Sequence, residues 1–309
     1  MLALRTAVRK VERLAYSPDG TRLAANGVGG TEVFDLGSQE SLALLDWSLC
    51  KSIAFCLDSN FLFEVSRSSG IRLTKLSTPQ GVVLNQSGDA YICYRWIPTL
   101  DSWIWCDGSG VRRPYLLWYI GGTVRRPTPG QLILWSYSFD PDLARSRGVA
   151  IFGDPLRVAV LASIHPPEGQ PTQYLYLLDG DTGELIRRHR CGYGSVEHFT
   201  GSPCGGYLVG VRQATLIVWD TSALHLPPQR WANDSRKQFT GVAFHPHGRY
   251  LLTASNDKSV KLWDLTCGQV VRSYDWSAGR MRSVAVAPDG LTAAAGSDEN
   301  LVVLFDLDL

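Results

Sequence analysis

The chain has 309 residues, with 30 basic and 29 acidic side chains and a formal net charge of +1. Charges this evenly balanced argue against a protein that its overall field holds to nucleic acid or to a membrane. The 30 glycines, 16 prolines and 10 tryptophans, against 2 methionines, favour short strands joined by tight turns over helices.

The first predicted strand, residues 2–8, stands alone ahead of a turn. Residues 13–20, RLAYSPDG, then form an apolar strand that ends in a Pro-Asp-Gly turn, and three more strands are predicted at 23–25, 31–36 and 41–46. Short apolar or alternating runs between turn residues are typical of strands. We expect the glycine-rich stretch 27–30 to be a turn between strands rather than a phosphate-binding loop.

The second and third groups of strands have weaker patterns. The second is predicted at 52–56, 61–65, 71–76 and 81–84. The third is predicted at 91–97, 103–106, 115–120 and 132–137, with Pro98 in its turn. In this register Pro18 and Pro98 stand two periods of about 40 residues apart. An alternative register with a turn at 86–89 would leave groups of uneven length.

The fourth and fifth groups follow the same order. The fourth has strands at 149–152, 157–163 and 173–179, with an insertion at 165–171 and a turn at 179–184. The fifth has strands at 196–200, 207–211 and 215–220, and its third strand ends in Trp219-Asp220.

The sixth group, within residues 238–276, has the clearest pattern. Its strands are predicted at 242–245, 250–254, 260–265 and 270–274, with a Pro-His-Gly turn at 246–248. The seventh group has strands at 283–287, 291–295 and 301–306, and it lacks a fourth strand. Four strands in about 40 residues form the repeating unit of a β-propeller blade.

The segment 255–264, SNDKSVKLWD, carries a resemblance to a known family. With Trp263-Asp264 at the end of the third strand, and an apolar strand before a Pro-x-Gly turn, it resembles the WD-repeat family of β-propellers. The resemblance covers essentially the whole chain and is strongest in the first, sixth and seventh groups. It implies an all-β fold, a seven-bladed β-propeller of four-stranded antiparallel blades in one domain, residues 1–309. The N-terminal strand would join the C-terminal blade and close the ring, which leaves no unpaired sheet edge within it.

The resemblance also implies residues with structural roles. Asp257 and Asp298 match the aspartates that hold a blade together from the turn between its second and third strands, while Trp219 and Trp263 close third strands. The histidine that partners this aspartate in the family, in a Gly-His pair before the first strand, is absent. We therefore expect a partial polar network.

Residues that could carry chemistry are sparse. The six histidines stand singly, apart from His245 and His247, and no carboxylate or cysteine has the spacing that would complete a metal site with these two. The sequence has no nucleophile elbow and no phosphate loop that opens a helix. We expect no catalytic residue, no cofactor and no metal.

Cysteine and hydropathy patterns indicate the compartment. The seven cysteines are scattered without the two-residue spacing of zinc or redox sites, which predicts buried thiols in a reducing compartment. No run approaches the roughly 18 apolar residues of a membrane span, and the apolar run at the N-terminus is too short for a signal peptide. We expect a cytoplasmic protein that does not bind membranes.

Two basic segments interrupt the repeats. Arg112-Arg113 and Arg125-Arg126 bracket the inserted stretch 108–130, and residues 187–190, Arg-Arg-His-Arg, are predicted to follow the fourth strand of the fourth group. They are either solvated loops or docking loops for an acidic partner.

The WD-repeat resemblance implies binding through the top face, the narrow face on which first strands begin. Its contact positions lie at the start of each first strand and just before the turn aspartate. By position these are Lys10, Glu12, Leu49, Lys51, Arg212, Gln238, Asn256, Arg280, Arg282 and Ser297.

Several of these positions are basic, which suits an acidic peptide or loop. We therefore expect a non-catalytic, monomeric scaffold that binds an unidentified protein or peptide and no specific nucleic acid. The alternatives are a propeller enzyme or small-ligand binder with its site at the channel mouth, or a regulatory module of a larger assembly.

Overall fold

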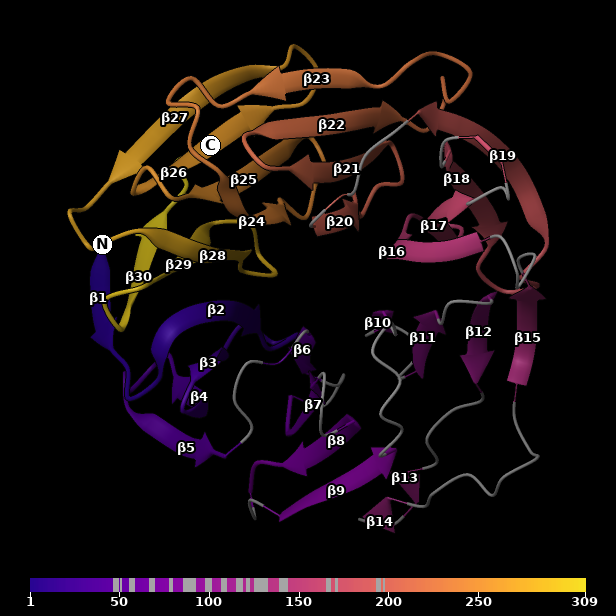
Figure 1. Ribbon diagram of the computed structural model, residues 1–309. Helices are drawn as coiled ribbons and strands as arrows, with labels where there is room; N and C mark the ends of the chain where they lie inside the picture. Colours follow the sequence, from indigo (N-terminus) through magenta and orange to yellow (C-terminus); the bar gives the residue numbers. More distant parts are fainter. Residues whose placement is uncertain are drawn as a thin grey trace. The chain divides into compact units, whose positions relative to one another are not determined.

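The computed structural model describes residues 1–46, 50, 52–55, 59–66, 70–77, 80–85, 93–97, 102–106, 110–114, 119–120, 123–124, 133–138, 144–164, 168–169, 172–192, 196 and 198–309. Every regular element among them is a strand, and the strands form antiparallel sheets of four, with one additional pair (Figure 1). The chain divides into two compact units, Met1–Gly88 with Asn233–Leu309, and Asp89–Ala232. We describe each unit by itself.

The first two sheets of unit 1 follow the predicted order. The first sheet contains β2 (Arg9–Tyr16), β3 (Arg22–Val28), β4 (Gly30–Asp35) and β5 (Ser41–Leu45), and the second contains β6 (Ser52–Phe55), β7 (Phe61–Ser66), β8 (Gly70–Lys75) and β9 (Gln80–Asn85). The glycine-rich stretch is the predicted hairpin turn, because Gly29 and Gly30 have φ angles of 109° and 136° that favour glycine.

The sixth and seventh sheets also belong to unit 1. The sixth contains β24 (Phe239–Phe244), β25 (Tyr250–Ser255), β26 (Ser259–Asp264) and β27 (Gln269–Asp275). The seventh contains β28 (Met281–Val286), β29 (Thr292–Ser297) and β30 (Leu301–Asp306), and its fourth strand is β1 (Leu2–Arg5).

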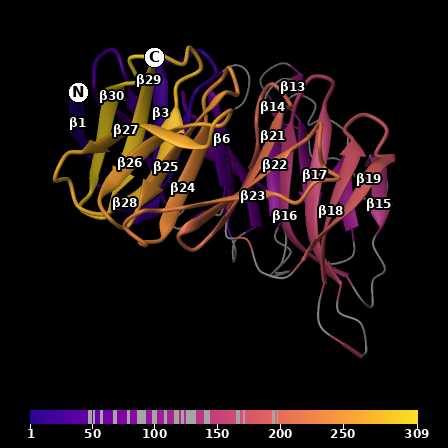
Figure 2. The same cartoon turned by 90° about the horizontal axis from the view of Figure 1, so that it is seen from above.

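The pairing of β1 with β30 joins the two ends of the chain. The strands are antiparallel, with Leu2 opposite Leu304 and Arg5 opposite Leu301. Figures 1 and 2 show the indigo β1 beside the yellow β30 in both views. The prediction that the N-terminal strand completes the C-terminal sheet is confirmed, whereas closure of a seven-bladed ring stays a prediction.

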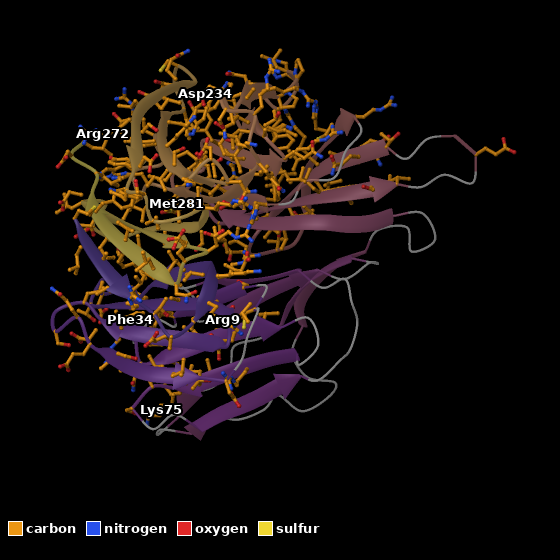
Figure 3. The ribbon with its side chains drawn as sticks, turned by 60° about the vertical axis from the view of Figure 1, so that its left-hand side comes forward. Arg9, Phe34, Lys75, Asp234, Arg272 and Met281 are labelled. Carbon is orange, nitrogen blue, oxygen red and sulfur yellow. The ribbon has the colours of Figure 1, made fainter. Side chains whose placement is uncertain are left out.

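Neighbouring sheets of unit 1 contact each other through their first strands. Thr240 Oγ1 of β24 donates a hydrogen bond to the carbonyl oxygen of Met281 in β28, at 2.6 Å. Ser283 Oγ of β28 in turn donates to the carbonyl oxygen of Val11 in β2, at 2.7 Å. Apolar side chains fill the space between the sheets, including the fully buried Met281 and the buried Phe34, which Figure 3 labels. Burial of these apolar surfaces is what holds consecutive sheets face to face.

The third sheet, in unit 2, departs from the predicted register. It contains β10 (Cys93–Ile97), β11 (Ser102–Cys106), β12 (Gly110–Pro114) and β15 (Ile133–Ser138), while β13 (Tyr119–Ile120) and β14 (Thr123–Val124) form a separate pair. The prediction of a third strand at 115–120 is wrong. That run is more apolar than Gly110–Pro114, but the latter follows β11 after a short connection, as hairpin partners usually do.

The fourth and fifth sheets complete unit 2. The fourth contains β16 (Ala144–Phe152), β17 (Arg157–Ile164), β18 (Thr172–Asp179) and β19 (Leu185–Gly192), and the fifth contains β20 (His198–Gly201), β21 (Tyr207–Arg212), β22 (Thr215–Asp220) and β23 (Gln229–Ala232). Their facing side chains form one core, in which Phe199 packs edge-on against Trp219 at 6.0 Å between ring centroids. Trp219, at 2% exposure, is therefore a core residue.

Candidate functional site

The top face of unit 1 is the edge where β2, β24 and β28 begin. In an antiparallel sheet the second strand ends at the edge where the first begins, so the turns after β3, β25 and β29 lie on this face as well. Lys10, Glu12, Gln238, Asn256 and Arg280 all lie at these positions. Leu49 and Lys51 fall outside the described residues, and Arg212 is an exposed residue at the end of β21 in unit 2.

Arg282 occupies a β-bulge near the start of its strand. Met281 is opposite Ser297 and Ser283 is opposite Gly296, so the intervening Arg282 has no residue opposite it. Thr240 holds the same position in β24, between Phe239 and Gly241. A bulge turns the additional side chain out of the regular alternation of the strand. The bulge therefore directs Arg282 toward the neighbouring sheets.

The guanidinium of Arg282 connects three sheets. Its Nη1 donates a long hydrogen bond to Asn256 Oδ1 of the sixth sheet, at 3.4 Å, and its Nη2 lies 3.7 Å from Glu12 Oε1 of the first sheet. The side chains of Arg282 and Glu12 are 25% and 32% exposed. We call Glu12, Asn256 and Arg282 the Arg282 cluster. It is part of the face that sequence reasoning assigned to binding.

Arg280 stands beside this cluster on a fixed backbone. Its N–H donates to Asp298 Oδ1 at 2.8 Å, and its carbonyl oxygen accepts a hydrogen bond from the N–H of Asp298 at 3.0 Å. Asp298 thus fastens the loop before β28, and the Arg280 side chain is exposed. Gln238 has the corresponding place in the sixth sheet, where its carbonyl oxygen accepts from the N–H of Asn256 at 3.0 Å.

Ser297 corrects the expected set of surface residues. It is fully buried, and its hydroxyl accepts hydrogen bonds from the N–H groups of Glu299 at 3.2 Å and Leu301 at 3.3 Å. The side chain therefore shapes the turn after β29 rather than the exposed face.

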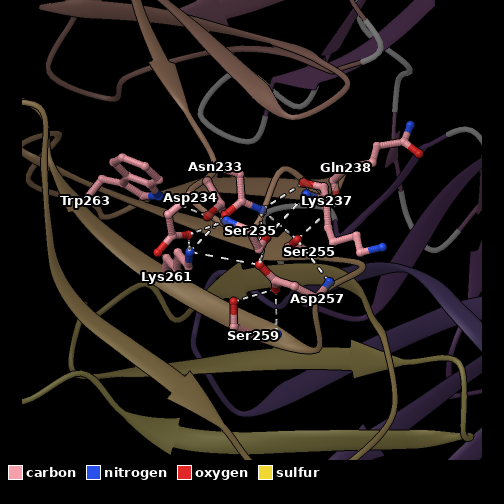
Figure 4. A network of polar contacts seen from close by, with 11 residues as sticks. Asn233, Asp234, Ser235, Lys237, Gln238, Ser255, Asp257, Ser259, Lys261 and Trp263 are labelled. Carbon is pink, nitrogen blue, oxygen red and sulfur yellow. Dashed lines mark hydrogen bonds and ion pairs between the residues drawn. The ribbon is translucent and has the colours of Figure 1, made fainter.

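Asp257 is the centre of a polar network below the top face (Figure 4). Its carboxylate accepts hydrogen bonds from Asn233 Nδ2 at 3.1 Å, Ser235 Oγ at 2.5 Å, Ser259 Oγ at 2.6 Å and Ser259 N–H at 3.0 Å. Burial by itself would raise the pKa of Asp257, but these hydrogen bonds outweigh burial and lower the pKa to about 2. Asn233 supplies a donor to the carboxylate although the Gly-His pair is absent, so the network is fuller than the sequence suggested.

Lys261 is a member of this network that sequence reasoning missed. Its side chain is only 8% exposed, and its Nζ donates to Asn233 Oδ1 at 2.8 Å, forms an ion pair with Asp234 and lies 4.0 Å from Asp257 Oδ2. A buried lysine needs such partners, because desolvation penalises an unpaired ammonium. Two sequence features could have predicted this buried ion pair: a lysine inside an alternating strand, and the Asn-Asp pair at 233–234.

The first and second sheets bury charged side chains at corresponding places. Glu32 of β4 accepts a hydrogen bond from Thr6 Oγ1 at 2.6 Å, and Arg72 of β8 lies 2.8 Å from Glu64 of β7. Burial raises the pKa of Glu64, with Arg72 opposing that shift. Sequence reasoning missed these pairs too, and we assign them to stability rather than to a binding site.

The predicted basic segments and the cysteines lie outside the Arg282 cluster and the Asp257 network. Residues 187–190 belong to β19 itself, so the prediction that they follow the fourth strand is wrong. Arg112-Arg113 belong to β12, and Arg125-Arg126 fall outside the described residues. Of the cysteines with described side chains, Cys50 is buried, Cys191 is half-buried, and Cys204 and Cys267 are exposed, so the expectation of buried thiols holds only in part.

The described residues contain neither a metal-binding cluster nor a membrane-crossing helix. No group of three or more histidine, cysteine, aspartate or glutamate side chains is arranged to hold a metal ion within the described ranges. In the same part of the chain, no helix has the length and apolar character that a bilayer-crossing segment requires.

Comparison with known sequences finds a match in the sixth sheet. Residues 233–264, which include Asn233, Asp257 and Trp263, match the family model "WD domain, G-beta repeat". A 68-residue segment is 38% identical to COMPASS component SWD1 of Saccharomyces cerevisiae, over 21% of this chain and 16% of that protein. A 149-residue segment is 34% identical to nuclear distribution protein PAC1 of Arthroderma otae, over 42% of this chain and 31% of that protein. The matches therefore span less than a third of these curated relatives.

Comparison with solved structures concerns the fold. The chain is similar to Kuenenia stuttgartiensis hydrazine synthase with a TM-score of 0.73, over 98% of this chain and 97% of that chain. The two sequences are 14% identical, so this likeness bears on the arrangement of strands and not on activity.

Proposed function

We propose that this chain, whose sixth sheet matches a WD-repeat model and whose fold is that of a β-propeller, is a non-catalytic scaffold whose top face binds a partner protein. The observation that carries the proposal is the Arg282 cluster, where one side chain of the seventh sheet contacts residues of two other sheets. Groups fixed by several sheets lose little freedom on binding, which favours recognition of a partner. The relatives support a role in assemblies, since one of them is named as a component of COMPASS.

The charges of this face favour an acidic segment of the partner. Lys10 and Arg280 are exposed, and Arg282 retains partial exposure beside Glu12. An acidic peptide or loop would meet two exposed cations and could compete with Glu12 for Arg282. Complementary charge of this kind mainly sets partner choice and association rate.

The wider organisation belongs to the same proposal. Residues 1–309 would form one seven-bladed ring, with β1 closing it, and act as a monomer in the cytoplasm. Its blades would hold the loops of the top face at fixed spacing, so that several contacts form together.

The test compares partners captured by the wild type and by the Arg280→Glu/Arg282→Glu variant, identified by mass spectrometry. The matched control is Arg5→Glu/Arg230→Glu, which makes the same charge change at exposed residues of two outer strands, β1 and β23. We expect the partner to remain with wild type and control and to be lost with the top-face variant, at unchanged melting temperature. Equal capture by all three proteins would refute binding through this face.

A further inference from the structure

The fourth strand of the fourth sheet, β19, has an unusual charge. Arg187, Arg188 and Arg190 are exposed on it, and the strand Leu185–Gly192 contains no acidic residue. The other outer strands with described side chains differ, because β5 carries no charge, β1 and β23 each carry a single arginine, and Arg272 of β27 is paired with Asp308 at 2.9 Å (Figure 3 labels Arg272). Only β19 therefore concentrates positive charge among the outer strands whose side chains are described.

The basic residues coincide with the regular part of this strand. Residues 187–190 pair one to one with β18, from Leu177 opposite Arg187 to Tyr174 opposite Arg190. The register shifts on either side of this stretch, which leaves Ile186 and Cys191 as bulge residues. A regular stretch between two bulges is where a further strand could pair with the sheet.

The outer edge of β19 is open in the described part of unit 2. The sheet order is β16-β17-β18-β19, so β19 pairs with β18 on one side only. The carboxylate of Asp179, just before the strand, is engaged in its own turn, where Oδ1 accepts from the N–H groups of Asp181 and Thr182 at 2.9 and 2.8 Å. Arg188 lies over the ring of Tyr174 at 5.0 Å, which positions its guanidinium on the sheet face without neutralising it.

We propose that β19 accepts an acidic, extended peptide as a fifth strand of the fourth sheet. The open edge offers main-chain N–H and C=O groups that only another polypeptide strand can pair with in register. Alternate side chains of a strand share a face, so acidic residues two apart on the peptide would meet Arg188 and Arg190.

The same charges disfavour the other occupants of such an edge. A second copy pairing through β19 would place arginines close to arginines, and like charges on adjacent strands are destabilising. A nucleic acid would satisfy the guanidinium groups but not the main-chain ladder. The site goes beyond the proposed top-face function, because it lies on a different strand edge in unit 2.

The probe for this site is a fluorescein-labelled peptide, Thr-Glu-Val-Glu-Val-Glu-Thr, titrated into the full chain and followed by fluorescence anisotropy. The first control is the same peptide with N-methyl groups on alternate amides, made in two versions so that each edge of the peptide strand is blocked in one of them. Both versions keep the charge of the parent peptide but cannot pair as a strand. The second control replaces glutamate by lysine, and the third is an oligothymidine of similar length. The protein variants are Arg188→Gln/Arg190→Gln, the charge-preserving Arg188→Lys/Arg190→Lys, and Arg230→Gln on β23 as matched control.

We expect the acidic peptide to bind the wild type and the Arg230→Gln control equally. Loss of two cross-strand charge pairs should weaken binding about three- to tenfold in the glutamine variant, with most affinity kept in the lysine variant. The methylated peptide should bind at least about tenfold more weakly than its parent, because it lacks the ladder.

Three outcomes would overturn the inference. They are equal binding of the methylated and parent peptides, binding of oligothymidine as tight as that of the peptide, and absence of peptide binding up to about 1 mM. The Arg280→Glu/Arg282→Glu variant separates this site from the top face, since it should keep the acidic peptide while it loses the captured partner.

Discussion

His245 and Gly290 link the sixth and seventh sheets through a hydrogen bond of 3.0 Å between Nε2 of the imidazole and the glycine carbonyl oxygen. The other ring nitrogen, Nδ1, accepts a hydrogen bond from the N–H of His247 at 3.2 Å. Both contacts are satisfied together only by a neutral ring that carries its proton on Nε2. A Cβ at Gly290 would lie 2.5 Å from Nε2, so the close approach depends on this glycine.

The His245 link makes stability depend on pH. Burial lowers the pKa of His245, and the hydrogen bond to Gly290 opposes that shift only in part. A histidine with a depressed pKa contributes stability that is complete above its ordinary value of about 6.5 and is lost as pH falls through the folded-state value. Ser17 holds the corresponding position in the first sheet, so serine is a suitable replacement. His245→Ser should lower the free energy of unfolding by about 1–3 kcal/mol at pH 7.5.

The measurement is urea unfolding of wild type and His245→Ser at pH 7.5 and at pH 5. The difference in unfolding free energy should shrink at the lower pH, because the wild type alone loses the contribution of a buried neutral ring. His247→Ser removes an exposed imidazole and serves as control. A difference that stays constant between the two pH values would contradict the assignment.

Asp257 and Asp234 share Lys261 as a partner but should contribute differently to the free energy of unfolding. The Asp257 side chain is 13% exposed and accepts several hydrogen bonds, whereas that of Asp234 is 82% exposed. Asp257→Ala should cost about 2–3 kcal/mol, as expected for charged hydrogen bonds lost from a protected site. Asp234→Ala should cost about 0–1 kcal/mol, as for a surface ion pair. Urea unfolding of both variants tests the contrast, and equal costs would show that the network is not centred on Asp257.

The N-terminal strand should contribute strongly to stability. Leu4 is 7% exposed in the core between the first and seventh sheets, and Thr6 donates to Glu32 beyond the end of β1. Leu4→Ala should cost about 2–5 kcal/mol, as for other buried leucines, and Arg5→Ala next to it should cost less than about 0.5 kcal/mol. Deletion of residues 1–9 should lower the melting temperature more than Leu4→Ala does. An unchanged melt after the deletion would rule out a closing role for β1.

Glu12 should restrain the binding strength of the top face. Its carboxylate lies 3.7 Å from Arg282, an ion pair of partly exposed groups that contributes about 0–1 kcal/mol to stability. Glu12→Gln should leave the melting temperature nearly unchanged and strengthen capture of an acidic partner, because it frees Arg282. Surface plasmon resonance against the captured partner provides the measurement, with Glu40→Gln as an exposed control. Weaker binding by Glu12→Gln would mean that the partner contacts Glu12 itself.

Most strands could be predicted from the sequence because turn residues mark their ends. The Pro-x-Gly turns and the Trp219-Asp220 and Trp263-Asp264 pairs set the register in the sheets where they occur. The third sheet lacks this pattern. The apolar run 115–120 was therefore predicted as its third strand instead of the basic segment Gly110–Pro114. The clustered arginines likewise led to the prediction of a loop at 187–190, whereas these residues lie in β19. An outer strand tolerates charged side chains because one of its edges faces water.

The candidate site could be predicted only in outline. Repeat alignment located the start of each first strand, and hence Arg280 and Arg282, because antiparallel pairing brings those starts to one edge. The contact of Arg282 with Glu12 depends on a bulge and on the packing of separate sheets, which no short sequence pattern encodes. The buried position of Lys261 had the same cause, since its partners Asn233 and Asp234 precede β24 and meet it only after the sheet has formed.

The pairing of β1 with β30 has a consequence for the growing chain on the ribosome. Domains generally form as the chain emerges, N-terminal parts first. Here Arg5 must wait for Leu301, and at translation rates of about 5–20 residues per second that delay is roughly 15–60 s. Throughout this interval β1 is an unmatched strand of the nascent polypeptide, a target for chaperones that shield open edges. β1 is thus synthesised before the other strands of its sheet but is among the last of them to find its partner.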